Sequence, residues 1–232
     1  MLNLRSAIGA VTLAASALFT AGAANAAVMV EGNSSGNFTS ISNCLGICSI
    51  SPNGKELKWG NLGQALPGST LTSVNTIWGK NTNEAGVVLA ELVWNNVSTL
   101  PLVTPVFFNA VFNLDFEFTA PEGATASESF DLAILNTGFA GDFMSGLSLN
   151  DLSGISFDLG TATVSNFRFD LAAGPGEFIH NIWYNPEKAT STMYLLADFT
   201  EVVVAEVPEP ASLTLLGAGL FGLAVLRRRR IL

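Results

Sequence analysis

The chain has 232 residues, which is enough for one sizeable domain or two small ones. Only 12% of the residues are charged and 49% are hydrophobic, so the composition excludes an intrinsically disordered chain. Between Ala27 and Glu206 stand 18 acidic and five basic residues, a net charge of −13. That balance excludes nucleic-acid binding through phosphates, and it predicts repulsion from anionic membranes and anionic polysaccharides.

Residues 1–26 have the pattern of a secretory signal peptide. Arg5 precedes an apolar run over 7–19, and Ala24 and Ala26 supply the small residues of a cleavage site. A buried core helix is the alternative, but an Ala-rich ending has no use in a core helix. The segment therefore predicts export, with cleavage after Ala26.

Residues 27–206 alternate apolar and polar side chains, as half-buried strands do. The clearest stretch is 112–118, where Phe112, Leu114, Phe116 and Phe118 share one face. A second stretch, 164–171, places Phe167, Phe169 and Leu171 together, and a third, 70–78, places every second residue from Leu71 on one face. Further strands are expected at these ranges: 36–41, 55–59, 86–94, 128–135, 155–159, 177–184 and 192–204.

Turn residues separate these predicted strands, notably at 51–54, 120–123 and 173–176. About ten short strands with such spacing are typical of an antiparallel β-sandwich. We therefore expect an all-β, jelly-roll-like secreted domain over 27–206. Residues 141–146, with a glycine at each end, are expected to form a short helix or a loop.

Residues 207–232 form a second targeting segment. It starts with Val207, Pro208, Glu209 and Pro210, continues for sixteen uncharged residues, and ends with Arg227, Arg228, Arg229 and Arg230. As a helix the uncharged run spans roughly 24 Å, slightly less than the bilayer hydrocarbon of about 30 Å. The arginines are a stop-transfer signal that stays on the cytoplasmic side. An ordinary single-span tail anchor is the alternative.

This tail resembles the PEP-CTERM sorting signal in the order of its three parts. The resemblance implies a Gram-negative, exopolysaccharide-producing host that forms biofilms, and recognition and cleavage near Pro-Glu-Pro by an exosortase. The body also resembles the choice-of-anchor K extracellular domains, through residues 51–54, 57–60, 112–116 and 131–134. That resemblance implies an extracellular module without catalytic activity.

Cys44 and Cys48 are the two cysteines of the chain. An exported protein meets an oxidising periplasm, so the pair predicts a disulfide that fixes a local turn. A redox or metal pair is the alternative, but redox motifs have two intervening residues and these cysteines have three.

The sequence carries little sign of catalysis. His180 is the single histidine, and no G-x-S-x-G segment accompanies it. It is interpreted as a strand residue with a satisfied partner. Asp115 and Glu117 lie on the solvent face of one strand and represent the weak case for a glycoside hydrolase. Calcium binding is favoured over catalysis, and its candidate ligands are Asp131, Asp142, Asp151 and Asp158.

Three hypotheses of function follow. The leading one is a non-enzymatic, exported surface or matrix protein, anchored in the inner membrane before an exosortase processes it, and in contact with exopolysaccharide. The second is a carbohydrate-binding module that stacks sugars on exposed aromatic rings, although the tryptophans are more often core residues. The candidate rings for this second hypothesis are Trp59, Trp78, Trp94 and Trp183, with Tyr184. The third hypothesis is the glycoside hydrolase.

Overall fold

The computed structural model describes residues 27–45, 47–60, 68–98, 106–138, 140–149 and 154–203. The predicted signal peptide and the predicted sorting segment, 207–232, lie outside these ranges. Within them, no helical segment has the length and hydropathy of a membrane span. The strands are β1 (Met29–Ser42), β2 (Ser49–Ile50), β3 (Glu56–Trp59), β4 (Ser69–Val74), β5 (Thr76–Asn81), β6 (Glu84–Asn95), β7 (Val106–Ala120), β8 (Ala124–Asn136), β9 (Asp142–Ser145), β10 (Phe157–Asp158), β11 (Ala162–Ala173), β12 (Glu177–Ile179), β13 (Ile182–Asn185) and β14 (Thr190–Glu201).

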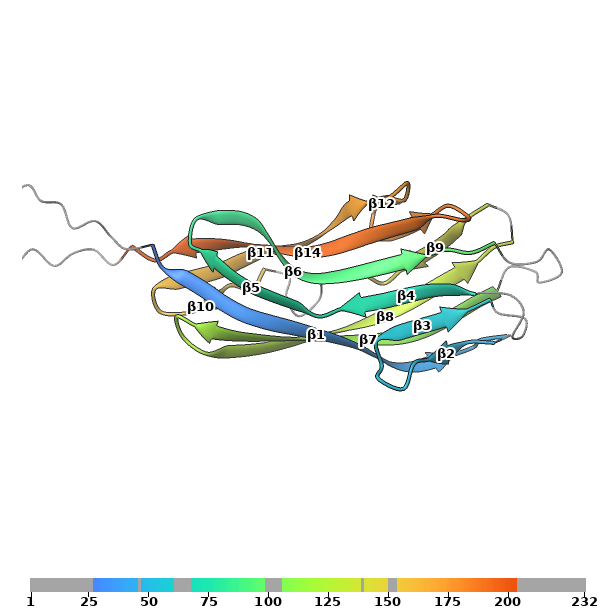
Figure 1. The fold of residues 1–232 in the computed structure, drawn as a ribbon, viewed down its shortest axis with the longest axis horizontal. Coiled ribbons are helices and arrows are strands. Elements are labelled where there is room, and N and C mark those ends of the chain that lie inside the picture. Colours follow the sequence, from blue (N-terminus) through green and yellow to red (C-terminus); the bar gives the residue numbers. More distant parts are fainter. Residues whose placement is uncertain are drawn as a thin grey trace, which may run out of the picture.

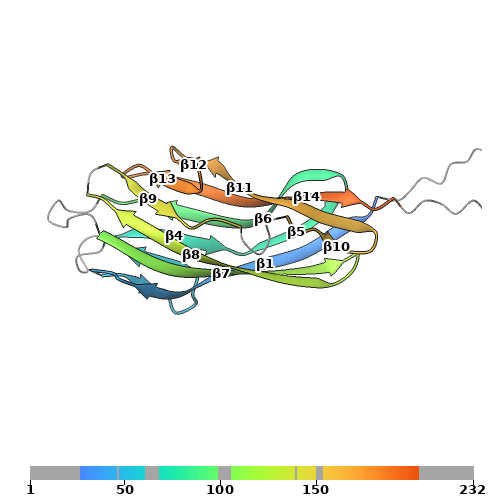
Figure 2. The ribbon, with the colours of Figure 1, turned by 180° about the vertical axis from the view of Figure 1, so that it is seen from behind.

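These strands form two antiparallel sheets that face each other in an elongated sandwich (Figures 1 and 2). One sheet has the order β12-β13-β9-β8-β7-β1-β5, and the other has the order β10-β11-β14-β6-β4-β3-β2. The predicted antiparallel β-sandwich is confirmed. β9, which follows β8 in the chain, lies between β8 and β13, so residues far apart in sequence become neighbours on one face.

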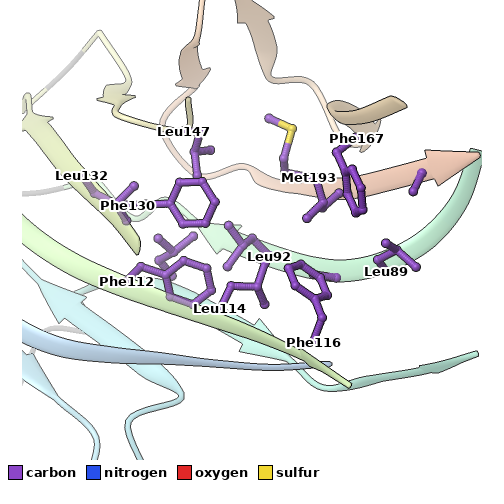
Figure 3. Close-up of a cluster of buried hydrophobic side chains, with 14 of the residues drawn as sticks. Leu89, Leu92, Phe112, Leu114, Phe116, Phe130, Leu132, Leu147, Phe167 and Met193 are labelled. Atoms are coloured by element: carbon purple, nitrogen blue, oxygen red, sulfur yellow. The ribbon is translucent and has the colours of Figure 1, made fainter. Parts of the chain in front are cut away.

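The core lies between the sheets and is rich in phenylalanine. Phe112, Leu114, Phe116 and Phe118 of β7 are each 1–2% exposed, which confirms the face predicted from alternation. Figure 3 shows the first three opposite leucines of β6 and Met193 of β14. Burying side chains of this size contributes about 1.5–3 kcal/mol each, so the strict alternation of β7 fixes its register.

β1 leaves room for these large rings by presenting small residues to the core. The Trp78 ring fills the space that a side chain at Gly32 would occupy, and the Phe112 ring does the same at Gly36. Both glycines lie in an extended strand, so the need for glycine here comes from close packing rather than from a special backbone angle.

Both ends of the described chain lie at the same end of the sandwich (Figures 1 and 2). The turn between β5 and β6 links them, because Thr82 N–H donates to Val28 O and Asn83 N–H donates to Phe199 O, at 2.8 and 2.7 Å. We call this the terminal end and the opposite one the distal end.

Three local predictions were wrong. The stretch 70–78 is not one strand: the chain leaves one sheet at Asn75 and enters the other, so Ile77 is 85% exposed and Trp78 is buried. The stretch 177–184 is a hairpin, and 141–146 contains strand β9. His180 is therefore a turn residue with a φ of 50°, followed by Asn181 at 63°, as in the two-residue hairpin turns that require positive φ at both positions.

Candidate functional site

A row of side chains crosses the outer face of the sheet that begins with β12. The strand register aligns Glu177, Tyr184, Phe143, Leu135 and Phe107, one residue from each of β12, β13, β9, β8 and β7. Neighbouring strands lie about 4.8 Å apart, so the row extends roughly 19 Å across the sheet. We call these five residues the outer row.

The aromatic members of the outer row reach solvent. Phe107 is 54% exposed and Phe143 is 38% exposed. The Phe143 and Tyr184 rings lie in contact, with centroids 5.0 Å apart and an interplanar angle of 39°. Two aromatic faces, followed by a third two strands away, form an apolar strip on the surface.

Tyr184 is held in place by the backbone of residues 140–141. Its hydroxyl donates to the Ala140 carbonyl at 2.6 Å, and its ring lies against Gly141, where an added Cβ would stand 2.7 Å from the ring. Gly141 has a φ of 92°, a conformation that side-chain-bearing residues rarely adopt. The backbone at 140–141 therefore sets the orientation of this ring before any ligand arrives.

A shallow hollow of about 480 Å³ adjoins the row at its β12 end. Its apolar lining includes Ile179 and Ile182, which are 55% and 44% exposed, beside Phe143 and Tyr184. Glu177 and His180 supply the polar groups of this hollow. An apolar surface with a few polar groups at its edge is the usual make-up of a small-molecule site.

The inner face of the same strands carries buried polar groups. Asp142 of β9 is fully buried: its carboxylate accepts hydrogen bonds from Thr137 N–H at 2.7 Å and from Trp59 Nε1–H at 3.3 Å. With its amide oriented to donate, Asn136 Nδ2–H gives a further hydrogen bond to Asp142 Oδ2 at 3.0 Å. Burial outweighs these bonds and raises the pKa of Asp142 to about 7.

Glu187 lies close enough to add to this effect by charge repulsion. Both of its carboxylate oxygens are enclosed, and the Ser98 hydroxyl and Gly141 N–H approach them without hydrogen bonds of good geometry among the described residues. Burial raises the pKa of Glu187 more than these donors and Lys188 lower it. Two acids in this environment disfavour charge on each other.

Reciprocal amide contacts close the distal end beside these acids. Asn96 Nδ2–H donates to the Asn185 carbonyl at 2.8 Å, and Asn185 Nδ2–H donates to the Trp94 carbonyl at 2.9 Å. Asn96 follows β6 and Asn185 ends β13, so these bonds join the two sheets. The bond from Trp59 to Asp142 joins the sheets in the same way, and the polar cluster is thus part of the sandwich closure.

All four tryptophans are buried, so the proposal that they stack on sugars is wrong. Their exposed fractions are between 0 and 5%. Three of them form a chain of contacts, with ring centroids 5.9 Å apart for Trp59 and Trp94 and 5.2 Å for Trp94 and Trp183. Trp78 packs separately on Phe118 at 5.6 Å. Their role is to fill the core.

The structure does not bring the predicted calcium ligands together. Asp131 is exposed on the outer face of β8, whereas Asp142 points inward and Asp158 lies on β10 near the terminal end. Asp151 lies outside the described residues. Among the residues that the structure describes, no group of three or more His, Cys, Asp or Glu side chains is arranged to hold a metal. Calcium binding stays a prediction from the sequence.

The other candidate residues fall at separate places. Asp115 and Glu117 are exposed on the outer face of β7, as predicted. Cys44 and Cys48 form the predicted disulfide, with their Cα atoms 6.3 Å apart, just after β1. The outer row was missed except for Tyr184, although alternation traced back from Phe112 through Phe108 points Phe107 outward.

One family model, the PEP-CTERM protein-sorting motif, matches residues 206–230. No curated protein matches the chain. PEP-CTERM motifs are exosortase substrates, so the match indicates an exported protein that passes through a membrane-anchored intermediate and is sorted to the cell surface. The matched residues begin three positions after the last described residue, Val203, at the terminal end of the sandwich.

Proposed function

We propose that this protein is a non-enzymatic component of the cell surface or exopolysaccharide matrix of a biofilm-forming Gram-negative bacterium. The sorting motif carries the proposal, because motifs of this kind occur on exported proteins that an exosortase sorts. The body suits this location: it is a β-sandwich with a disulfide, a bond that forms in oxidising compartments. We further propose that the body is a choice-of-anchor K-type domain and that 1–26 is removed as a signal peptide.

The position of the motif supports processing without damage to the body. β14 ends at Glu201, and the chain then leaves the terminal end of the sandwich. Pro208 and Pro210 each disfavour helix at the preceding residue, so the sequence predicts an extended segment that an enzyme at the membrane surface can reach. Cleavage there separates the sandwich from the arginine-bearing tail.

The proposal of a non-enzymatic role rests on the placement of the chemically active groups. Asp142 and Glu187 are the described acids whose pKa values are raised; Asp142 is fully buried, and the carboxylate oxygens of Glu187 are covered, so neither carboxylate is open to substrate. Asp115 and Glu117 lie on an exposed strand face. This arrangement favours a structural role for the inner acids and a solubilising role for the outer ones.

A carbohydrate-binding module is the second candidate function. The buried tryptophans do not support it, but the exposed aromatic rings of the outer row do. The two proposals are compatible, since a matrix protein that binds glycan would be retained where its sorting signal sends it.

Processing of the tail is the test of the leading proposal. In a host with a matching exosortase, Glu209→Ala, or serine in place of the four arginines, should leave the sandwich folded and abolish correct cleavage. Glu201→Ala is the matched control, since it changes a glutamate just outside the motif. Mass spectrometry of matrix-associated protein measures the result, and wild-type protein that still ends at Leu232 would refute the proposal.

A further inference from the structure

We propose that the outer row binds a neutral, linear polysaccharide, which lies across strands β13, β9, β8 and β7 with sugar rings over Tyr184, Phe143 and Phe107. Glu177 and His180 contact sugar hydroxyls at the β12 end. The inference rests on the proposed function in one respect: the exported body must meet glycan outside the cell.

The first support is a local departure from the normal strand pattern. β9 and β13 bury Met144 and Trp183 as expected, but β9 also buries Asp142 and exposes Phe143, and β13 also buries Asn185 and exposes Ile182. A sandwich gains stability from the opposite arrangement, with aromatic side chains inside and polar side chains outside. Positions that break the local rule in this way are expected at functional sites.

The second support is the geometry of the row. Tyr184 and Phe143 are one strand apart, and Phe107 is two strands further, roughly 10 Å from Phe143. The first spacing is close to one sugar repeat of an extended linear glycan, and the second is close to two repeats. Pyranose rings offer an apolar C–H face to an aromatic ring and a rim of hydroxyls to polar groups, which matches an aromatic strip next to Glu177 and His180.

The third support is position, which favours a glycan over a lipid surface. Trp183, between Ile182 and Tyr184 of β13, donates to Ser191 at the start of β14, whereas the chain leaves toward the sorting motif after Glu201. Ser191 and Glu201 are ten residues apart along β14, so roughly 33 Å of strand separates them. A chain tethered at its C-terminal segment therefore holds the outer row away from the tether.

The fourth support is charge, which selects a neutral ligand. The net charge of −13 between Ala27 and Glu206 repels polyanions such as uronic-acid polymers. The charged member of the outer row is Glu177, a carboxylate that accepts hydrogen bonds from hydroxyls and opposes negative groups.

Affinity electrophoresis of the full chain tests the inference, with a non-ionic detergent that lacks a sugar headgroup. The gels contain hydroxyethyl cellulose, laminarin or dextran as neutral probes, and alginate as the anionic probe. We expect at least one neutral glucan to retard the protein and alginate to leave it unretarded. Phe143→Ala should weaken retardation about tenfold, which corresponds to about 1.4 kcal/mol.

Ile77→Ala is the matched control, because it removes an exposed apolar side chain on β5, outside the row. Unchanged thermal melting of the Phe143→Ala variant shows that loss of binding is local. Failure of all three neutral glucans to retard the protein, or equal retardation of wild type and Phe143→Ala, overturns the inference. So does a wild-type dimer that Phe143→Ala converts to a monomer, since a second copy would then occupy the row.

These results separate the inference from the proposed function. Absence of glycan binding in a protein whose tail is correctly processed overturns the inference and the second candidate function, and leaves the leading proposal standing. Glycan binding by a protein whose tail is never processed overturns the proposed sorting and keeps the outer row as a glycan site.

Discussion

The inward and outward faces of β9 and β13 carry side chains that differ from the usual arrangement, in which apolar residues point inward and polar residues point outward. Inward, Asp142 and Asn185 sit among buried amides and tryptophans, and outward, Phe143 and Tyr184 form an aromatic surface. Consecutive residues point to opposite sides of a sheet, so two strands of four residues serve both purposes. The comparison teaches that these strands bury Met144 and Trp183 as usual, and in addition bury a polar residue and expose an aromatic one.

The inner face contributes to stability through the hydrogen bonds of Asp142 and of the Asn96 and Asn185 side-chain amides. A buried polar group costs about 1–3 kcal/mol when it lacks a partner, so the bonds of Asp142 to Thr137 and Trp59 are needed for the sheets to close at the distal end. The outer face has no such requirement. Its aromatic rings are free to contact a ligand because the fold does not depend on burying them.

The largest expected effect comes from truncating one residue on each face. Trp183→Ala should lower the free energy of unfolding by about 3–5 kcal/mol, because it leaves a cavity beside Trp94 and removes the bond to Ser191. Phe143→Ala should change it by less than about 1 kcal/mol, since the ring is partly exposed. Urea unfolding measures both, and equal losses for the two variants would show that the outer ring is structural.

The predictable parts of the fold were those with strict alternation of strongly apolar residues. In β7, phenylalanine and leucine alternate with polar residues over 112–118, and burial drives the register directly. The disulfide was also predictable, since the chain has two cysteines and they are close in sequence. Local spacing is sufficient in both cases.

β1 shows why other parts were not predictable. A strand was expected at 36–41 but not at 32–35, because residues 32–35 are glycine, asparagine and serine, which usually form turns. They form a strand because Trp78 and Phe112 of neighbouring strands fill the space above Gly32 and Gly36. The cause lies in tertiary packing, which local propensity does not contain.

The outer row was hidden for a related reason. Its members come from five strands, and β9 and β13 pair although some forty residues separate them in the chain. Short strands with a polar residue inside, such as β9 between two glycines, look like loops when the sequence is interpreted locally. Alternation identified the face of each residue, but the row itself depends on a strand order that sequence alone does not show.

An intermediate effect is expected from the buried acids, as a dependence of stability on pH. The pKa of Asp142 rises from 3.8 to about 7 on folding, so the folded protein binds more protons than the unfolded chain within that window. The free energy of unfolding should therefore fall as pH rises from 4.5 to 8, by roughly 2–4 kcal/mol. The raised pKa of Glu187 acts in the same direction.

Asp142→Asn should flatten this dependence, since the side chain keeps one acceptor and no longer titrates. Asp131→Asn is the matched control: it changes the net charge equally but removes an exposed carboxylate, so the slope should persist. Urea unfolding at several pH values above 4.5 avoids the window in which Asp198 titrates, because its hydrogen bonds to Asn166 and Arg168 lower its pKa. A slope that persists in Asp142→Asn would assign the effect to other groups.

The smallest expected effect comes from the disulfide, which does not stabilise the inward or the outward face of β9 and β13 through its own contacts. Cys44 and Cys48 close a five-residue loop after β1, and both are partly buried against the core. A loop this short restricts the unfolded chain little, so the double Cys→Ser variant should lose about 2 kcal/mol or less in urea unfolding. Binding to neutral glucan and the slope of stability against pH should both stay at wild-type values, because the outer row and the buried acids lie on other strands. Loss of glycan binding in the double variant, with the sandwich still folded, would mean that the loop around Leu45 belongs to the binding surface and that the outer row is not a self-sufficient site.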